Sequence, residues 1–269
     1  MELAASASKE KWIEYFARTG IIAKGIVYCL IGLLTLLAAL GFRGQKMDKA
    51  DAFKVIYEQP FGKTLLIIIA IGLFGYVTWR LFQSIRDIDN KGNDSKAIMI
   101  RIGYAFSAFI YLSLGIYAFK LALEGSSSGE GDAQKTLISK LLDYPGGAWM
   151  LGIVAIIIII NGFRQIYKGS LKRFMKNVNF YQSKHASIFE RAGIIGYVSR
   201  GVVLLIIGYF FLRAALNKNA SEAQGTKGVF DFLENNFGSL LMGAVAFGLL
   251  GYGIFMFVKA RYQKIDIHF

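Results

Sequence analysis

Histidine, cysteine and proline are scarce in this chain of 269 residues, which contains two, one and two of them. With Cys29 alone, no disulfide can form within the chain. The histidines, His185 and His268, lie outside the apolar runs, so the chain offers neither paired haem ligands inside a bundle nor a Cys/His metal cluster. A nucleophile elbow and a phosphate-binding glycine loop are missing too. We therefore expect no cofactor, no metal and no enzymatic activity.

Acidic residues are missing from the middle of every long apolar run. Ion- and proton-coupled transporters usually place ionisable groups at that depth, where such groups are costly. This absence argues against a coupled transporter.

Long apolar runs are what the chain has in abundance. Hydrophobic residues make up 55% of the sequence, against roughly 45–50% in soluble domains. Runs of about 18 apolar residues or more are typical of transmembrane helices. The sequence therefore predicts an all-α polytopic membrane protein with six spans. These are expected near Ile21–Phe42, Thr64–Phe82, Ile102–Phe119, Gly147–Ile166, Gly193–Leu212 and Ser239–Val258.

Basic residues are distributed unevenly between the loops. With six spans, both termini lie on one side, and 20 of the 31 lysines and arginines fall on that side. The positive-inside rule then predicts that both termini are cytoplasmic. The first 20 residues lack the pattern of a cleaved signal peptide. The basic stretch "YKGSLKRFMKNVNFYQSK" follows a span, so we expect it to bind anionic lipid headgroups of the bilayer, at about 1 kcal/mol per cation, rather than nucleic acid.

An internal repeat organises the sequence. A shift of 176 positions aligns Gly20–Leu40 with Gly196–Leu216, and Glu58–Tyr76 with Glu234–Tyr252, with 18 identities in 40 positions. A more diverged copy lies between them and carries Ser107 where the others have a cation. Repeats of this kind determine the architecture. The predicted units are three tandem two-helix repeats that point the same way, over residues 15–90, 98–176 and 188–269.

The repeat opens with an arginine, a glycine, a basic residue, a second glycine and an aromatic residue: Arg18, Gly20, Lys24, Gly25 and Tyr28. In this pattern and in its triplication the chain resembles the bacterial membrane family known as domain of unknown function 1206. The resemblance covers nearly the whole chain and implies a six-span protein of the bacterial cytoplasmic membrane. It transfers no activity.

Two cations inside spans, Lys24 and Arg200, occupy equivalent positions of the first and third repeats. One interpretation is that each is an anchor whose long stem lets the charge reach the cytoplasmic headgroups. The alternative is that both face an internal cavity together with Tyr28 and Asn161. Asn161 is also expected to bond a neighbouring helix.

Glycines recur at helical spacing on the spans. Small residues let helix backbones approach closely in a membrane, and we expect these glycines to hold the two helices of each hairpin together. The set comprises Gly25, Gly32, Gly72, Gly75, Gly201, Gly208, Gly248 and Gly251.

Each outer connection predicts a short amphipathic helix at the membrane interface, followed by an acidic residue and, four residues later, a glycine. The acidic residues are Glu58, Asp143 and Glu234. We expect the glycines to adopt the left-handed conformation of a helix-ending turn. An alternative role for the acids is a ring around a pseudo-threefold axis that attracts cations.

Two functions of different classes fit these observations. The first is a non-enzymatic structural, scaffolding or partner-binding membrane component. The second is a small-solute or ion carrier or channel with a pseudo-threefold bundle. A polar centre lined by Lys24, Arg200 and Asn161 would favour the second. Homo-oligomerisation and protein partners stay open.

Overall fold

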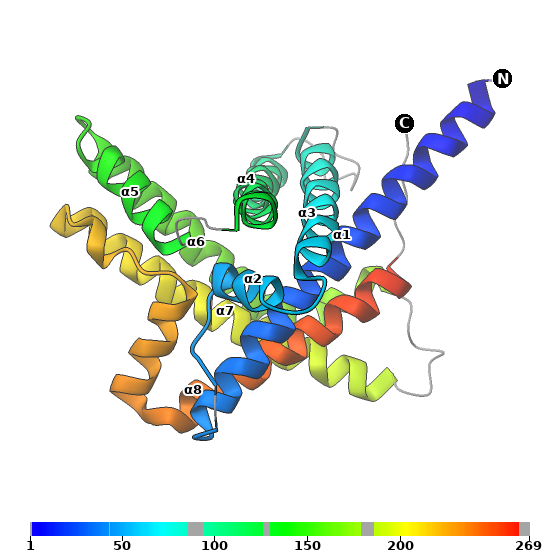
Figure 1. The fold of residues 1–269 in the computed structure, drawn as a ribbon. Helices are drawn as coiled ribbons and strands as arrows, with labels where there is room; N and C mark the ends of the chain where they lie inside the picture. The colour runs from blue at the N-terminus through cyan, green and yellow to red at the C-terminus, as the bar shows by residue number, and fades with distance from the viewer. Residues whose placement is uncertain (1, 43, 86–93, 126–129, 179–185, 264–269) are drawn as a thin grey trace.

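The computed structural model describes residues 2–42, 44–85, 94–125, 130–178 and 186–263, and most of these residues are helical. Six long helices dominate (Figure 1): α1 (Glu2–Ala39), α3 (Gly62–Ile85), α4 (Ser95–Glu124), α6 (Gly147–Ser170), α7 (Ala186–Asn217) and α8 (Thr226–Tyr262). All six are long and apolar enough to cross a membrane. The prediction of an all-α protein with six transmembrane helices is therefore confirmed.

The predicted spans agree with these helices except at one end. The first was expected to continue to Phe42, but α1 ends at Ala39 because Gly41 takes a left-handed φ of 76°. Five helices contain their predicted span entirely. These five helices are longer than the predicted spans because polar flanking residues continue each helix beyond its apolar run.

Short elements occupy the connections. These are α2 (Lys49–Tyr57), α5 (Glu130–Leu142), η1 (Arg173–Asn177) and η2 (Ala220–Glu222). The two outer helices α2 and α5 match the expected amphipathic helices. Their third counterpart is the first part of α8, which bends at Gly238, where φ is 83°.

The turn that ends each outer helix differs from the expectation. Of the three glycines, only Gly238 has a positive φ, and its ψ of 168° is extended rather than left-handed helical. In the other two copies the positive φ lies one residue earlier, at Phe61 and Gly146. Gly62 and Gly147 instead lie where the chain passes close to the backbone of the preceding helix, so that a side chain has no room there. A Cβ at Gly62 would overlap the carbonyl oxygen of Ile56 on the preceding turn.

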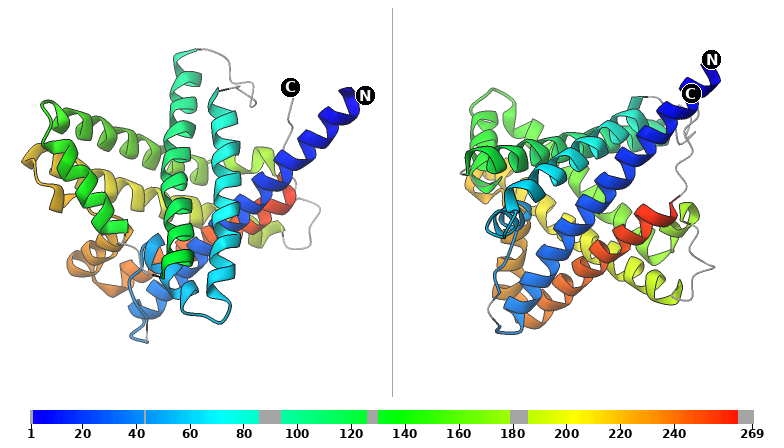
Figure 2. Two further views of the ribbon diagram at one scale, coloured as in Figure 1. Left: turned by 45° about the horizontal axis from the view of Figure 1, so that its top comes forward. Right: turned by 45° about the vertical axis from the view of Figure 1, so that its right-hand side comes forward.

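The long helices pack as three pairs, and each pair joins two different repeats. Helix α1 packs against α8, α3 against α4, and α6 against α7. Figure 2 shows that the three pairs run in different directions and cross near the middle of the molecule. Helices α1 and α3, and α7 and α8, also pack closely within their repeats. The helices of the middle repeat, α4 and α6, splay apart.

Candidate functional site

Lys24 lies on α1 at the crossing of the helix pairs, and its residue is only 4% exposed. Its Nζ atom lies 5.2 Å from the ring centroid of Tyr111, 5.3 Å from that of Tyr252 and 5.4 Å from that of Tyr76. Tyr28 adds a fourth ring at 6.0 Å. The interpretation of Lys24 as an anchor that reaches the headgroups is therefore wrong. Ring faces, which attract cations electrostatically, surround its ammonium group instead.

Arg200, on α7, points into the same place. Its Nε donates a hydrogen bond to the hydroxyl of Tyr28 at 3.1 Å, and its Nη1 donates one to the hydroxyl of Tyr252 at 2.9 Å. Lys24 lies over the same two rings. The two cations that the repeat aligns in sequence thus meet in space, over the rings of Tyr28 and Tyr252.

A third cation, Arg80 of α3, completes the group. Its Nε donates to the hydroxyl of Tyr76 at 2.8 Å, and its guanidinium lies 4.9 Å from the ring centroid of Tyr104. Sequence reasoning missed it because it lies close to the end of its predicted span. A usable signal was present: Arg80 follows Tyr76 by four residues, and Tyr76 is aligned with Tyr252 by the repeat.

We call this group the cation–tyrosine centre. It consists of Lys24, Arg80 and Arg200 with Tyr28, Tyr76, Tyr104, Tyr111 and Tyr252. The rings also pack against one another. Tyr28 meets Tyr252 edge to face at 4.9 Å, and Tyr76 meets Tyr111 in the same way at 4.8 Å. Five of the six spans supply a residue to the centre, and α6 is the exception.

No acidic side chain among the described residues forms an ion pair with a cation of the centre. In the described part of the chain, the ion pairs involve other cations, such as Lys46 and Lys172. An unpaired buried charge is expensive, costing several kcal/mol even after the protein relaxes. Cation–π contacts return roughly 2 kcal/mol or more each when desolvated. The centre therefore concentrates positive charge that aromatic rings and hydroxyl groups, rather than carboxylates, balance.

Two other polar residues of the spans lie elsewhere. Asn161 was expected either to line a cavity with Lys24 and Arg200 or to bond a neighbouring helix. Its Nδ2 instead donates to the carbonyl oxygen of Ile157 on its own helix at 2.9 Å. Thr35 is fully buried, and its hydroxyl accepts a hydrogen bond from the backbone of Met47. Thr35 thus ties the outer connection to α1.

The glycines of the first helix in a repeat pack differently from our expectation. Gly25 and Gly32 face α8, and Gly201 and Gly208 face α6. A Cβ at Gly201 would lie 2.8 Å from the carbonyl oxygen of Gly162. These glycines therefore join neighbouring repeats rather than the two helices of one hairpin.

The glycines of the second helix follow the expectation more closely. Gly72 faces α1, and Gly248 and Gly251 face α7, so each contacts the first helix of its own repeat. Gly75 is buried on α3.

The outer acids differ in their surroundings. Glu58 and Asp143 are exposed, whereas Glu234 pairs with Lys46. No three acidic or histidine side chains among the described residues are grouped so that they could hold a metal ion. His185 and His268 lie outside those residues.

Lys46 instead fastens the outer connection of the first repeat to α8. Its Nζ atom lies 2.7 Å from Oδ1 of Asp231 and also bonds Glu234. Hydrogen bonds to Asp231 and Glu234 raise the pKa of Lys46 above its ordinary value.

The arginines that open the repeats cap helix ends. Arg101 donates from Nε to the carbonyl oxygen of Ser84 and from Nη2 to that of Ile85, both at 2.7 Å, at the end of α3. Arg18 bonds the carbonyl oxygens of Ala260 and Gln263 at the end of α8 in the same way. A positive charge at a helix C-terminus is favourable, which explains the arginine of the opening motif.

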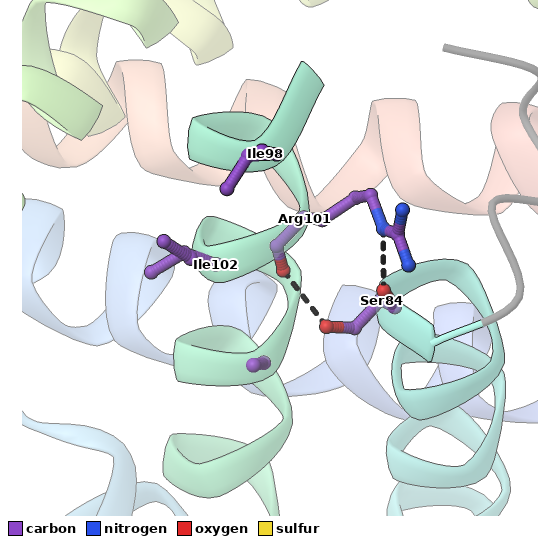
Figure 3. Close-up of a pocket in the computed structure, with 5 residues that line it drawn as sticks. Ser84, Ile98, Arg101 and Ile102 are labelled. Atoms are coloured by element: carbon purple, nitrogen blue, oxygen red, sulfur yellow. Dashed lines mark hydrogen bonds between the residues drawn. The ribbon is translucent and has the colours of Figure 1, made fainter. Parts of the chain in front are cut away.

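A hollow of about 420 Å³ lies beside the Arg101 cap (Figure 3). Ile98 and Ile102 of α4 line it together with Ser84. The guanidinium of Arg101 turns away from these isoleucines toward the end of α3. The hollow is thus an apolar notch beside a helix cap, and the charged chemistry lies in the cation–tyrosine centre.

Comparison with known proteins agrees with the repeat. The family described as Domain of Unknown Function (DUF1206) matches residues 19–87, 102–172 and 195–263. An uncharacterized protein YxxB of Bacillus subtilis (strain 168) is 31% identical over 257 residues, which cover 94% of this chain and 92% of that protein. No solved structure matches.

Proposed function

This chain belongs to the family described as Domain of Unknown Function (DUF1206). We propose that it is a small-solute carrier or channel. The observation that supports the proposal is the cation–tyrosine centre. Ionisable residues inside a membrane are costly, and where they occur they usually mark the path of a substrate or ion. A protein that only had to hold six helices together would gain more from leucine at Lys24 and Arg200.

The location of the centre fits a pathway. It lies where the three helix pairs cross, and its residues come from all three repeats. Lys24 and the tyrosines at 28, 76, 111 and 252 are each no more than 8% exposed. Arg80 and Arg200 are half-buried at the edge of this group. In the proposed carrier this is a state in which the path is closed around Lys24.

The remaining parts of the proposal concern the setting. The protein acts without enzymatic chemistry in the bacterial cytoplasmic membrane, with both termini in the cytoplasm. The excess of lysine and arginine on the terminal side supports this orientation. Anionic headgroups of the cytoplasmic leaflet are its lipid partners.

A scaffolding or partner-binding role is the second candidate. The same tight packing favours it, because rings in direct contact leave a dry bundle. In that case the cations would serve only to bind tyrosine hydroxyls and rings.

Flux through reconstituted protein separates the two. The full chain would be placed in liposomes, and the movement of potassium, chloride, phosphate and succinate would be followed. We expect at least one probe to move faster than in protein-free liposomes, and Lys24→Met to slow it at least tenfold. Lys120→Met, which removes an exposed cation near the outer end of α4, should leave the rate unchanged. Rates equal to those of empty liposomes for all four probes would favour the scaffold.

Water access gives a second test. Ser107 lies three residues after Tyr104 and four before Tyr111, so it shares the face of α4 that meets the centre. In a Cys29→Ser background, Ser107→Cys should react with a membrane-impermeant thiol reagent if the path opens. Unreactive Ser107→Cys from both sides would support a dry bundle.

A further inference from the structure

We infer that the cation–tyrosine centre binds an oxyanion with two negative charges, of the phosphate or sulfate class. The inference rests on the proposed function, because this oxyanion would be the solute of the carrier or channel.

The charge balance of the centre is the first argument. Lys24, Arg80 and Arg200 come from three different helices and share tyrosine rings, so they form one group rather than three separate sites. No carboxylate from the described residues pairs with any of them. The two guanidinium groups stay charged at any physiological pH, so a monovalent anion would leave one of them uncompensated, whereas a divalent anion would balance both.

The hydrogen-bond inventory is the second argument. Arg200 uses Nε and Nη1 for tyrosine hydroxyls, and Arg80 uses Nε for a tyrosine hydroxyl and Nη1 for the Oε1 of Gln83. Within the described contacts, Nη2 of each guanidinium still has its hydrogens to donate. Each hydroxyl that accepts from an arginine can also donate its own hydrogen. The centre is therefore rich in donors and poor in acceptors, which is the environment that a multiply charged oxyanion requires.

The chemistry of the donors is the third argument. Guanidinium groups bind planar pairs of oxygens on phosphate, sulfate or carboxylate, and an ammonium group adds a point charge. Tyrosine hydroxyls recognise oxygens without adding negative charge. A metal cation or an amine would find no acidic ligand among the described residues of the centre and would be repelled by its guanidinium groups.

Thermal unfolding of the purified full chain in detergent tests the inference. Inorganic phosphate and sulfate should each raise the melting temperature by roughly 5 °C at concentrations well above the dissociation constant. Chloride and acetate at the same ionic strength should not. The shift should vanish in Lys24→Met and Arg200→Met and persist in Lys120→Met. Equal shifts in wild type and both centre variants, or no shift with any oxyanion, would overturn the inference.

Two additions keep the test decisive. Arg200→Lys retains the charge, so a folded protein with weakened phosphate binding is expected even if Arg200→Met does not fold. Delipidated protein that ignores inorganic phosphate but is stabilised by phosphatidic acid would identify a lipid phosphate as the bound group. A response to inorganic phosphate alone would identify the free ion.

The outcome is separable from that of the proposed function. Phosphate-dependent stabilisation without flux would support the oxyanion site and contradict transport. Flux of potassium without any stabilisation by phosphate or sulfate would support transport and contradict the oxyanion site.

Discussion

The first and third repeats have the same two-helix plan as the middle repeat but use it differently. In the first and third repeats the two helices pack closely, and each carries a cation at the equivalent position, Lys24 or Arg200. In the middle repeat that position holds Ser107, and α4 and α6 splay apart. Contacts between repeats are kept in all three copies. The middle copy therefore contributes Tyr104 and Tyr111 to a centre whose three cations all come from the other two copies.

Alanine at the first motif glycine should show the largest difference between the copies. A Cβ at Gly196 would lie 2.5 Å from the backbone of Tyr252, so Gly196→Ala must push α7 and α8 apart. We expect a loss of about 3 kcal/mol or more, measured by thermal unfolding in detergent.

Gly103 is the matched control in the middle repeat. Its Cβ would meet only the ends of side chains, Arg164 Nη1 at 3.7 Å and Asn161 Oδ1 at 3.8 Å. Gly103→Ala should therefore be neutral, or gain up to about 1 kcal/mol from helix propensity. Equal losses at both positions would show that α4 and α6 pack as closely as α7 and α8.

Much of this architecture could be predicted from the sequence. Apolar run length gives the six spans, and the shift of 176 positions pairs Lys24 with Arg200. The direction of the Lys24 side chain could not be predicted, because a lysine near a span end can reach either headgroups or the interior. Which helix faces Gly25 and Gly201 also escaped prediction, since a small residue shows that a neighbour is close but not which one. The role of Arg80 was missed for the same reason as that of Lys24. When lysines and arginines are counted to predict the orientation, every cation near the end of a span is treated as an anchor.

Lys24→Met should stabilise the protein while abolishing its function. In a buffer without phosphate or sulfate, the variant removes a buried charge that has no acidic partner and keeps a side chain of similar length. We expect a gain of about 1–4 kcal/mol in unfolding free energy, seen as a higher melting temperature, together with loss of flux.

Ser107→Ala in the middle repeat is the control for Lys24→Met, because it changes the equivalent position without altering charge. Its melting temperature should match wild type. A strong loss of stability in Lys24→Met would mean that the four ring contacts outweigh the cost of burial, and the charge would then be structural.

The smallest effect is expected at Lys46, which links the first and third repeats outside the membrane-spanning part. The middle repeat has no counterpart of this link to Glu234 among the described ion pairs. Lys46→Met should lower the melting temperature by only a degree or two, because partly exposed ion pairs are screened. Added salt should lower the melting temperature of wild type toward that of the variant and leave the variant unchanged.

The pH dependence of the Lys46 link has a defined sign. Its hydrogen bonds raise the pKa of Lys46 above the ordinary value of 10.5 in the folded protein. The stabilisation is therefore complete below pH 10.5 and is lost as the pH rises through the higher folded value. The difference in melting temperature between wild type and Lys46→Met should thus persist from pH 7 to pH 10 and shrink above that range. A difference in melting temperature that disappears near pH 7 would show that the link depends on a group that titrates at neutral pH. The first and third repeats would then be joined by other contacts.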